Sequence, residues 1–102
     1  HYTEAYDGIN SLIEQYPDSA MAYAARGGME KERGMLELAE FDYAKAMELD
    51  AGNEDFAFNH VDILIQLGRK DEAYRDLKKL LDAGCQPGRL QNFYARLKKK
   101  KK

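Results

Sequence analysis

Residues 34–49 read GMLELAEFDYAKAMEL, and residues 68–83 read GRKDEAYRDLKKLLDA. The two stretches lie 34 positions apart. When they are aligned at this spacing, small, apolar, turn and charged residues of one stretch match residues of the same kind in the other. The matching pairs are Gly34 and Gly68, Ala39 and Ala73, Asp42 and Asp76, Tyr43 and Leu77, Lys45 and Lys79, and Ala46 and Leu80. Agreement of several residue types at one fixed spacing indicates an internal repeat.

The register extends beyond these two stretches. Glu4-Ala5-Tyr6 reappears as Glu72-Ala73-Tyr74, which is 68 positions, or twice 34, further along the chain. Ile9 and Leu12 fall in the register of the apolar pairs. The sequence therefore predicts a half repeat over residues 1–19, full repeats over 20–53 and 54–87, a capping helix over 88–97, and a lysine tail over 98–102.

The residues inside this register favour α-helices. Ala, Leu, Glu, Lys, Met and Arg are common, and they lose little conformational freedom in a helix. Apolar residues recur at helical spacing in Thr3–Gln15, Ala20–Arg33, Met35–Leu49, Glu54–Leu67, Arg69–Ala83 and a sixth segment that opens at Pro87. In the third segment we expect an inward face of Leu38, Ala39, Tyr43, Ala46 and Met47. Because the linkers are short, we expect an all-α fold of antiparallel helical hairpins.

Several residues stand at the signature places of a known repeat. Tyr23 occupies its aromatic place, Arg26-Gly27 its Leu-Gly place, and Ala39-x3-Tyr43 its A-x3-F place. The chain thus resembles the tetratricopeptide repeat, a 34-residue helix-turn-helix unit. The second repeat matches at Ala57, His60-Val61, Leu64 and Ala73-x3-Leu77, and the departures are Glu30 for the usual tyrosine, Val61 for glycine, and Ala51 and Cys85 for proline.

The resemblance implies an α-solenoid of antiparallel helix-turn-helix repeats with a C-terminal capping helix. It also implies a non-catalytic protein-protein interaction module, a scaffold or adaptor. We expect the sixth segment to cover the last hairpin with Leu90, Phe93 and Leu97 and to turn its lysines toward water. The first segment carries Tyr2, Tyr6 and Tyr16, so contact with another hairpin or with a second copy of the chain is plausible.

Composition narrows the classes of function. The chain has 102 residues, 44% of them hydrophobic and 33% charged, with a formal net charge of −2. These values predict one folded domain whose body is not built to bind a polyanion. The single cysteine, Cys85, permits neither an internal disulfide nor a cysteine-based zinc site. No apolar run approaches the ~20 residues of a membrane span. A cytoplasmic location is favoured, and a removed signal or anchor before His1 is left open.

No pattern in the sequence predicts catalysis, a cofactor or a metal site. His60 is interpreted as a packed or half-exposed helical histidine, and Cys85 as a spacer in a turn. Gly27-Gly28 lies inside a predicted helix, where it does not form a phosphate loop. A solvated helix surface with charge pairs is predicted for Glu30, Lys31, Glu32, Arg33, Glu37, Glu40, Lys45, Glu48 and Asp50. We therefore expect that the protein is not an enzyme.

The resemblance places partner-binding residues on the first helix of each repeat. In the first repeat these are Met21, Ala24, Gly28, Lys31 and Glu32. In the second they are Asp55, Phe58, Asn59, Asp62, Ile65 and Gln66. Helical spacing separates the stripe of Asp55, Phe58, Asp62 and Ile65 from the apolar stripe of Phe56, Ile63, Leu64 and Leu67. Phe58 and Ile65 are thus expected either to contact a ligand or to pack against neighbouring helices.

A carboxylate clamp, which some members of the family use to hold an acidic chain end, is not expected. Ala24, Gly28 and Phe93 stand where that clamp needs polar or cationic groups. Two alternatives to a protein-binding groove stay open. The lysines at 98–102 could bind nucleic acid or an anionic membrane, although a solvated tail is the commoner role of such a run. The chain could also be a self-assembling piece of a larger repeat protein.

Overall fold

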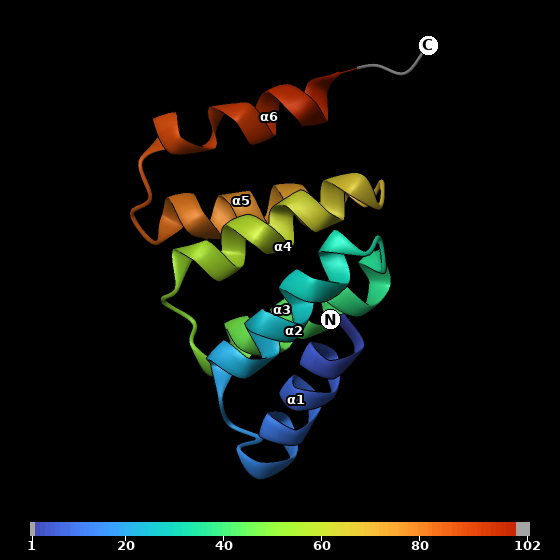
Figure 1. Cartoon of the computed structure of the whole chain (residues 1–102). Helices are drawn as coiled ribbons and strands as arrows, with labels where there is room; N and C mark the ends of the chain where they lie inside the picture. Colours follow the sequence, from blue (N-terminus) through green and yellow to red (C-terminus); the bar gives the residue numbers. More distant parts are fainter. Residues whose placement is uncertain (1, 100–102) are drawn as a thin grey trace.

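The computed structural model describes residues 2–99, and over this range the protein is all-α, as predicted. Its elements are α1 (Tyr2–Gln15), α2 (Ala20–Glu32), α3 (Leu36–Leu49), α4 (Glu54–Gln66), α5 (Lys70–Asp82), the 3-10 turn η1 (Pro87–Leu90) and α6 (Gln91–Lys98). Each end of the first five helices lies at the expected residue or one residue from it. Figure 1 shows these helices following one another from α1 at one end of the molecule to α6 at the other.

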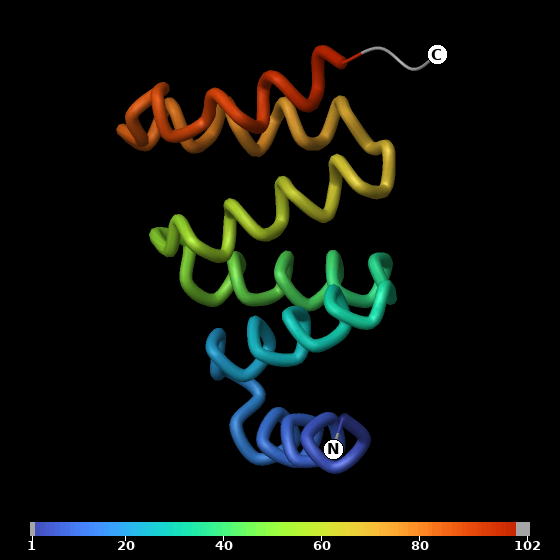
Figure 2. The backbone as a smooth tube through the Cα atoms, turned by 45° about the horizontal axis from the view of Figure 1, so that its top comes forward, coloured from blue at the N-terminus to red at the C-terminus, as the bar shows by residue number. Residues whose placement is uncertain are grey.

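The helices pack mainly against their neighbours in the sequence. The tightest pair is α2 with α3, followed by α3 with α4 and α4 with α5. The tube in Figure 2 shows these antiparallel helices stacked along one direction. The molecule measures 40 × 33 × 18 Å, and the smallest dimension corresponds to about two helix diameters. Contacts are therefore local along the stack, as they are in helical arrays.

Local residue chemistry explains where the helices begin and end. Ser19 caps α2 by accepting a hydrogen bond from the Ala22 N–H, and Asn53 caps α4 in the same way. Gly34 and Gly68, which lie two residues after the ends of α2 and α4, both have a φ of 78°. This left-handed conformation is costly for residues with a Cβ, which explains glycine at both helix ends.

Two clusters of buried side chains form the core. One lies between α4, α5 and α6 and contains Ala57, Val61, Leu64, Ala73, Leu77, Leu80, Cys85, Leu90 and Leu97. The other lies between α2, α3 and α4 and contains Ala24, Ala39, Tyr43, Ala46, Phe56 and Ile63. The small residues Ala39, Ala46 and Ala73 are fully buried at helix contacts. As expected, Leu90 and Leu97 of the last segment are buried and Phe93 packs on the same cluster.

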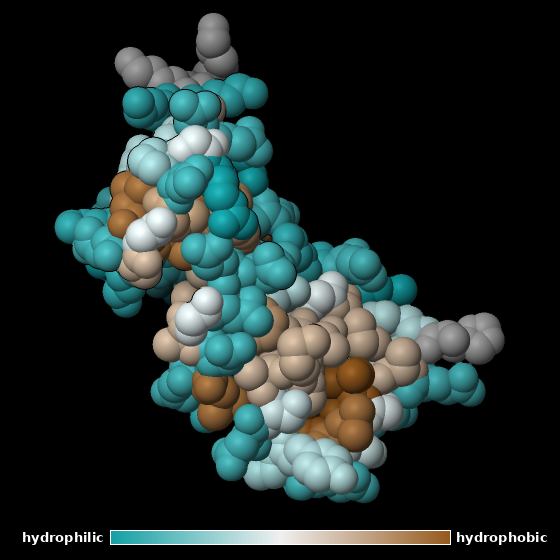
Figure 3. Space-filling view, turned by 90° about the vertical axis from the view of Figure 1, so that its left-hand side faces the viewer, coloured by the Kyte–Doolittle hydropathy of each residue, from teal (hydrophilic) through white to brown (hydrophobic). Residues whose placement is uncertain are grey.

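The α1–α3 end of the molecule leaves apolar side chains exposed. Helix α1 has no buried residue, and Leu12 is 44% exposed. Leu38 was expected to face inward, but it is 51% exposed, and Phe41 on the same helix is 63% exposed. The prediction for Leu38 is wrong because no helix of the described chain lies over that side of α3. Figure 3 shows hydrophobic surface gathered at this end of the molecule.

Candidate functional site

Most of the predicted partner-binding residues lie on one face, which α2, α4 and α6 form together. We call it the α2–α4–α6 face. Met21, Glu32, Asp55 and Gln66 are exposed there, whereas Gly28, Lys31, Phe58, Asn59, Asp62 and Ile65 are half-buried. Ala24 is the exception. It is buried in the core cluster with Ala39 and Tyr43, because α2 packs closely on α3, so its methyl group does not reach this face.

Ion pairs join the three helices across this face. The Lys31 Nζ lies 2.6 Å from Asp62 Oδ2 and donates a 3.1 Å hydrogen bond to Asn59 Oδ1. Arg96 Nη1 of α6 lies 2.7 Å from the other Asp62 oxygen. Burial alone would raise the pKa of Asp62, but the hydrogen bonds from Lys31 and Arg96 outweigh it and hold that pKa below its ordinary value. Asp62 is thus an ionised centre that links α2, α4 and α6.

A hollow of about 420 Å³ opens beside these ion pairs. It is lined by Gly28, Lys31, Glu32, Tyr43, Asn59 and Gln66. Five of the six residues were predicted from the sequence, and their position confirms only that they lie together. Tyr43 was predicted as a core residue and not as part of this surface. Its ring is indeed buried, but its hydroxyl reaches the hollow past the glycine pair of α2.

The glycine pair makes room for Tyr43. A Cβ at Gly27 would lie 2.9 Å from the Tyr43 ring, and a Cβ at Gly28 would lie 3.3 Å from its hydroxyl oxygen. Real Cβ atoms essentially never approach a neighbour within 3.0 Å, so the first position excludes any larger residue while the ring stays in place. Adjacent glycines inside a helix, which are disfavoured by intrinsic propensity, were the sequence feature that marked this close approach.

Aromatic residues border the other side of the face. The Phe58 ring of α4 lies 6.0 Å from the Phe93 ring of α6, and the Arg89 guanidinium lies 4.8 Å above Phe58. Arg89 also forms a 2.6 Å ion pair with Glu54. Phe58 and Ile65 are both packed against the C-terminal core cluster. Contact with a ligand and packing against neighbouring helices were both left open for these two side chains, and the neighbouring helices cover part of each.

A buried histidine lies behind this face and was not recognised as part of a polar cluster. His60 is 7% exposed and lies between two carboxylates, with Nδ1 on Asp76 of α5 and Nε2 2.9 Å from Glu40 of α3. Burial lowers the pKa of His60, but the hydrogen bonds to Asp76 and Glu40 outweigh it and raise that pKa above its ordinary value. If Asp76 and Glu40 are both ionised, both ring nitrogens must donate, and because a neutral imidazole has only one N–H, His60 is then in the charged form.

A second polar cluster joins α1, α2 and α3. Glu30 was predicted to be a solvated surface residue, but it is 1% exposed and accepts a 2.6 Å hydrogen bond from the Tyr6 hydroxyl. Burial raises the pKa of Glu30 to about 7, with a further contribution from Asp42. The prediction is wrong because Glu30 points toward α1 and α3, and the alternation of charges along one helix does not report those neighbours.

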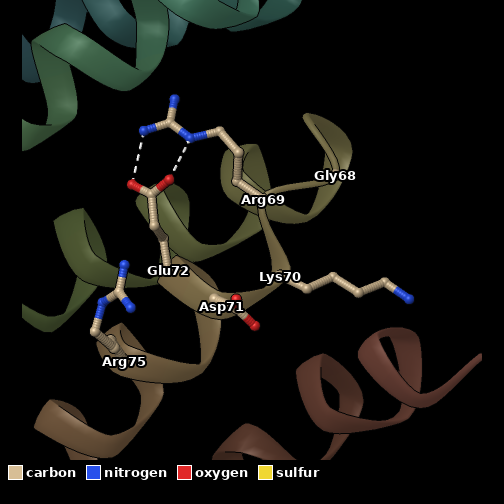
Figure 4. Close-up of a pocket in the computed structure, with 6 residues that line it drawn as sticks. All are labelled: Gly68, Arg69, Lys70, Asp71, Glu72 and Arg75. Carbon is tan, nitrogen blue, oxygen red and sulfur yellow. Dashed lines mark hydrogen bonds and ion pairs between the residues drawn. The ribbon is translucent and has the colours of Figure 1, made fainter.

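Another hollow, of about 450 Å³, lies at the turn between α4 and α5 (Figure 4). Its residues are Gly68, Arg69, Lys70, Asp71, Glu72 and Arg75. The Arg69 guanidinium donates hydrogen bonds of 2.6 and 2.7 Å to the two Glu72 oxygens, and Lys70 points away from them (Figure 4). Because it lies at an exposed turn and its best-placed pair, Arg69 and Glu72, is already satisfied, we consider this hollow a weaker candidate than the one beside Tyr43.

Among residues 2–99 there is no group of three or more His, Cys, Asp or Glu side chains able to hold a metal ion. No described helix combines the length and the apolar character needed to cross a membrane. Lys98 and Lys99 are exposed, and the rest of the predicted lysine tail lies outside the described residues. In comparisons with known proteins, no family model matches this chain and no curated protein is significantly similar to it.

Proposed function

We propose that the chain is an α-solenoid of tetratricopeptide type, with a half repeat (1–19), two repeats (20–53 and 54–87) and a capping helix (88–97). Support comes first from the helix caps. Ser19 has φ −83° and ψ 103°, and Asn53, 34 positions later, has φ −85° and ψ 104°. Gly34 and Gly68, also 34 positions apart, share a φ of 78°. Equal backbone geometry at equal spacing is expected of repeated units.

The buried polar contacts supply a second line of support. Arg26 pairs with Asp42, and His60 pairs with Asp76, so both pairs join residues 16 positions apart. The second pair occupies the places of the first shifted by 34 positions. Side-chain chemistry differs between them, because a guanidinium is replaced by an imidazole, but each joins the first helix of a repeat to the second.

We further propose that the protein is a non-catalytic interaction module whose partner is a peptide or protein segment on the α2–α4–α6 face. The observation that carries this proposal is the hollow beside Tyr43, bordered by the linked Lys31, Asp62 and Arg96 side chains. Side chains that are already held in place lose little freedom when a partner binds, which favours affinity. Met21, Gly28, Lys31, Glu32, Asp55, Asn59, Asp62 and Gln66 are the proposed contact residues, with Phe58 and Ile65 contributing their uncovered edges.

A displayed library of random twelve-residue peptides, selected on the immobilised chain, tests this function. Enriched peptides are then synthesised and titrated into the ¹⁵N-labelled chain, and amide shifts locate the site. We expect dissociation constants near micromolar, about −8 kcal/mol, with shifts at Gly28, Lys31, Asn59 and Gln66. Asn59→Ala should weaken binding, whereas the matched surface variant Lys78→Ala on α5 should not.

Two results would contradict the proposal. The first is a library from which no peptide is enriched. The second is a set of shifts confined to the hollow of about 430 Å³ between α3, α4 and α5, which is lined in part by Ala44, Ala51 and Ala83. That outcome would assign the partner to the opposite side of the helical hairpins.

Self-association is a second candidate, supported by the exposed apolar side chains of the α1–α3 end. Leu12, Leu38 and Phe41 are 44%, 51% and 63% exposed, and such exposure is typical of surfaces that another chain covers. Sedimentation equilibrium of the chain and of a Leu38→Ser/Phe41→Ser variant tests it. A concentration-dependent dimer that is lost in the variant supports this candidate, and a monomer at all concentrations excludes it.

A further inference from the structure

Some charged groups of the α2–α4–α6 face form ion pairs with one another, and others do not. Three cations of this face have a carboxylate partner: Lys31 and Arg96 both pair with Asp62, and Arg89 pairs with Glu54. Two carboxylates of the face, Glu32 and Asp55, have no ion-pair partner within residues 2–99. In the hollow beside Tyr43, the Glu32 carboxylate is therefore unpaired, whereas Lys31, the cation of its lining, is already paired with Asp62.

The hollow also contains a hydroxyl with no hydrogen-bond partner among the described residues. Tyr43 is 6% exposed, and its ring is held by the core cluster that includes Ala24 and Ala39. Its oxygen lines the hollow, because Gly28 has no side chain to block it. Burial raises the pKa of Tyr43, and the nearby Glu32 carboxylate raises it further, so the hydroxyl stays neutral and Glu32 lies within its electrostatic reach.

Building on the proposed peptide-binding function, we propose that this hollow receives a lysine or arginine side chain of the partner segment. The cation of that side chain would form an ion pair with the Glu32 carboxylate and donate an N–H to the Tyr43 hydroxyl oxygen. Charge-assisted hydrogen bonds of this kind are the stronger ones in proteins. A volume of about 420 Å³ lies within the range of small-ligand sites and has room for one long side chain.

An anionic group fits this hollow less well. The only cation that lines it is Lys31, which already lies 2.6 Å from Asp62 and donates to Asn59. An incoming carboxylate would have to compete with Asp62 for Lys31 and would approach Glu32, a like charge at close range. A cation could instead bind the Glu32 carboxylate and the Tyr43 hydroxyl, and it would displace no existing ion pair.

The test uses the peptides selected from the displayed library and calorimetric titration. Each enriched peptide is compared with a version in which its basic residue is replaced by glutamine. The chain is used unaltered and as Glu32→Gln, Tyr43→Phe and Glu37→Gln, the last removing an exposed carboxylate of α3 that lies outside this face. Circular dichroism and thermal unfolding of each variant establish that the fold is retained.

We expect lysine or arginine at one fixed position of the enriched peptides. The Glu32→Gln variant should bind them about tenfold more weakly, as expected for the loss of a hydrogen bond to a charged group. Tyr43→Phe should lower the affinity about threefold to tenfold, and Glu37→Gln should leave it unchanged. For the glutamine peptides, Glu32→Gln should make no difference, so a double-mutant cycle shows coupling between Glu32 and the basic residue.

Four outcomes would overturn the inference. Enriched peptides without a conserved basic residue, or equal binding by the unaltered chain and Glu32→Gln, would contradict it and leave the proposed peptide-binding function in place. Enrichment of acidic peptides whose binding is lost in Lys31→Gln would assign the hollow to an anion. If no peptide is enriched, the proposed function and this inference both fail.

Discussion

Arg26 holds both oxygens of the Asp42 carboxylate, with its Nε and Nη2 each 2.8 Å from one oxygen. Arg26 also donates a 3.0 Å hydrogen bond to Asn10 of α1. One guanidinium therefore connects α1, α2 and α3. The Asp42 carboxylate depends on it, because this aspartate is 1% exposed, and buried charges require a partner.

Replacing Arg26 should strongly destabilise the N-terminal half of the stack. Arg26→Ala leaves the buried Asp42 without its ion partner, and we expect a loss of about 3 kcal/mol in the free energy of unfolding. Arg26→Lys should lose less, since it keeps the charge but not the two-point geometry. Urea unfolding followed by circular dichroism measures both.

Lys78→Ala, which breaks an exposed pair with Asp82, is the control and should change stability by less than about 1 kcal/mol. Equal effects of Arg26→Ala and Lys78→Ala would contradict the assignment.

The buried Glu30 should make the fold less stable as the pH rises. In the folded chain its pKa is raised from 4.5 to about 7, so between these values the folded state binds more protons than the unfolded state. The free energy of unfolding then falls with rising pH through this window. Glu30→Gln cannot ionise, yet it keeps an acceptor for Tyr6. At pH 8 we expect the free energy of unfolding of this variant to exceed that of the unaltered chain by on the order of 2 kcal/mol.

Urea unfolding at pH 4.5, 6, 7 and 8 checks this expectation. The advantage of Glu30→Gln should shrink toward the acidic end, where the unfolded state also holds its proton. Glu37→Gln, at an exposed position of α3, serves as the control and should show no such trend. Parallel pH profiles for the unaltered chain and Glu30→Gln would mean that Glu30 is not protonated in the fold.

The raised pKa of His60 predicts a second loss of stability at higher pH. Its folded pKa is raised above 6.5, so its contribution is complete below pH 6.5 and is lost as the pH rises through the folded value. His60→Gln should lower the free energy of unfolding by about 1–3 kcal/mol at pH 6 and flatten the profile above it. The measurement is best made in the Glu30→Gln background, where the first pH effect has been removed.

The imidazole of His60 can also be observed directly. Nitrogen chemical shifts of the labelled ring distinguish the doubly protonated form from either neutral tautomer. Contacts of Nδ1 with Asp76 and Nε2 with Glu40 lead us to expect the doubly protonated form at pH 6.5. A neutral ring at that pH would contradict the charged form expected for His60.

Two glycine substitutions should have opposite signs. Gly8 lies in α1 with nothing within 4 Å of an added Cβ, so Gly8→Ala should stabilise the helix by about 0.5–1 kcal/mol. In Gly27→Ala the new Cβ meets the buried Tyr43 ring at 2.9 Å, and we expect a loss of about 1–3 kcal/mol. Thermal unfolding of both variants measures this. Stabilisation by Gly27→Ala would show that the Tyr43 ring is not held where the structure has it.

The positions of the helices were predictable from the sequence because they depend on local features. Ser19 and Asn53 have cap side chains, and Gly34 and Gly68 supply the left-handed residues that end a helix. These features act within a few residues along the chain. The 34-residue spacing then indicated that the same local units recur, so the helix bounds followed to within a residue.

The orientation of single side chains was less predictable. Leu38 and Glu30 were assigned the wrong environment for the same reason, since helical spacing defines stripes but not which neighbour covers each stripe. Leu38 faces a side of α3 with no helix over it, and Glu30 faces Tyr6, which lies 24 positions earlier in the chain. The pairing of His60 with Glu40 and Asp76 likewise depends on three different helices.

By itself the sequence determined the helical class and the helix ends to within a residue, because periodicity and caps are properties of neighbouring residues. Only the tertiary structure decided which charges neutralise one another and which stay free. It brought the Tyr43 hydroxyl into the hollow through the gap at Gly28 and left Glu32 without an ion partner among the described residues. Those relationships depend on distances between different helices, and helix spacing within one segment does not contain them.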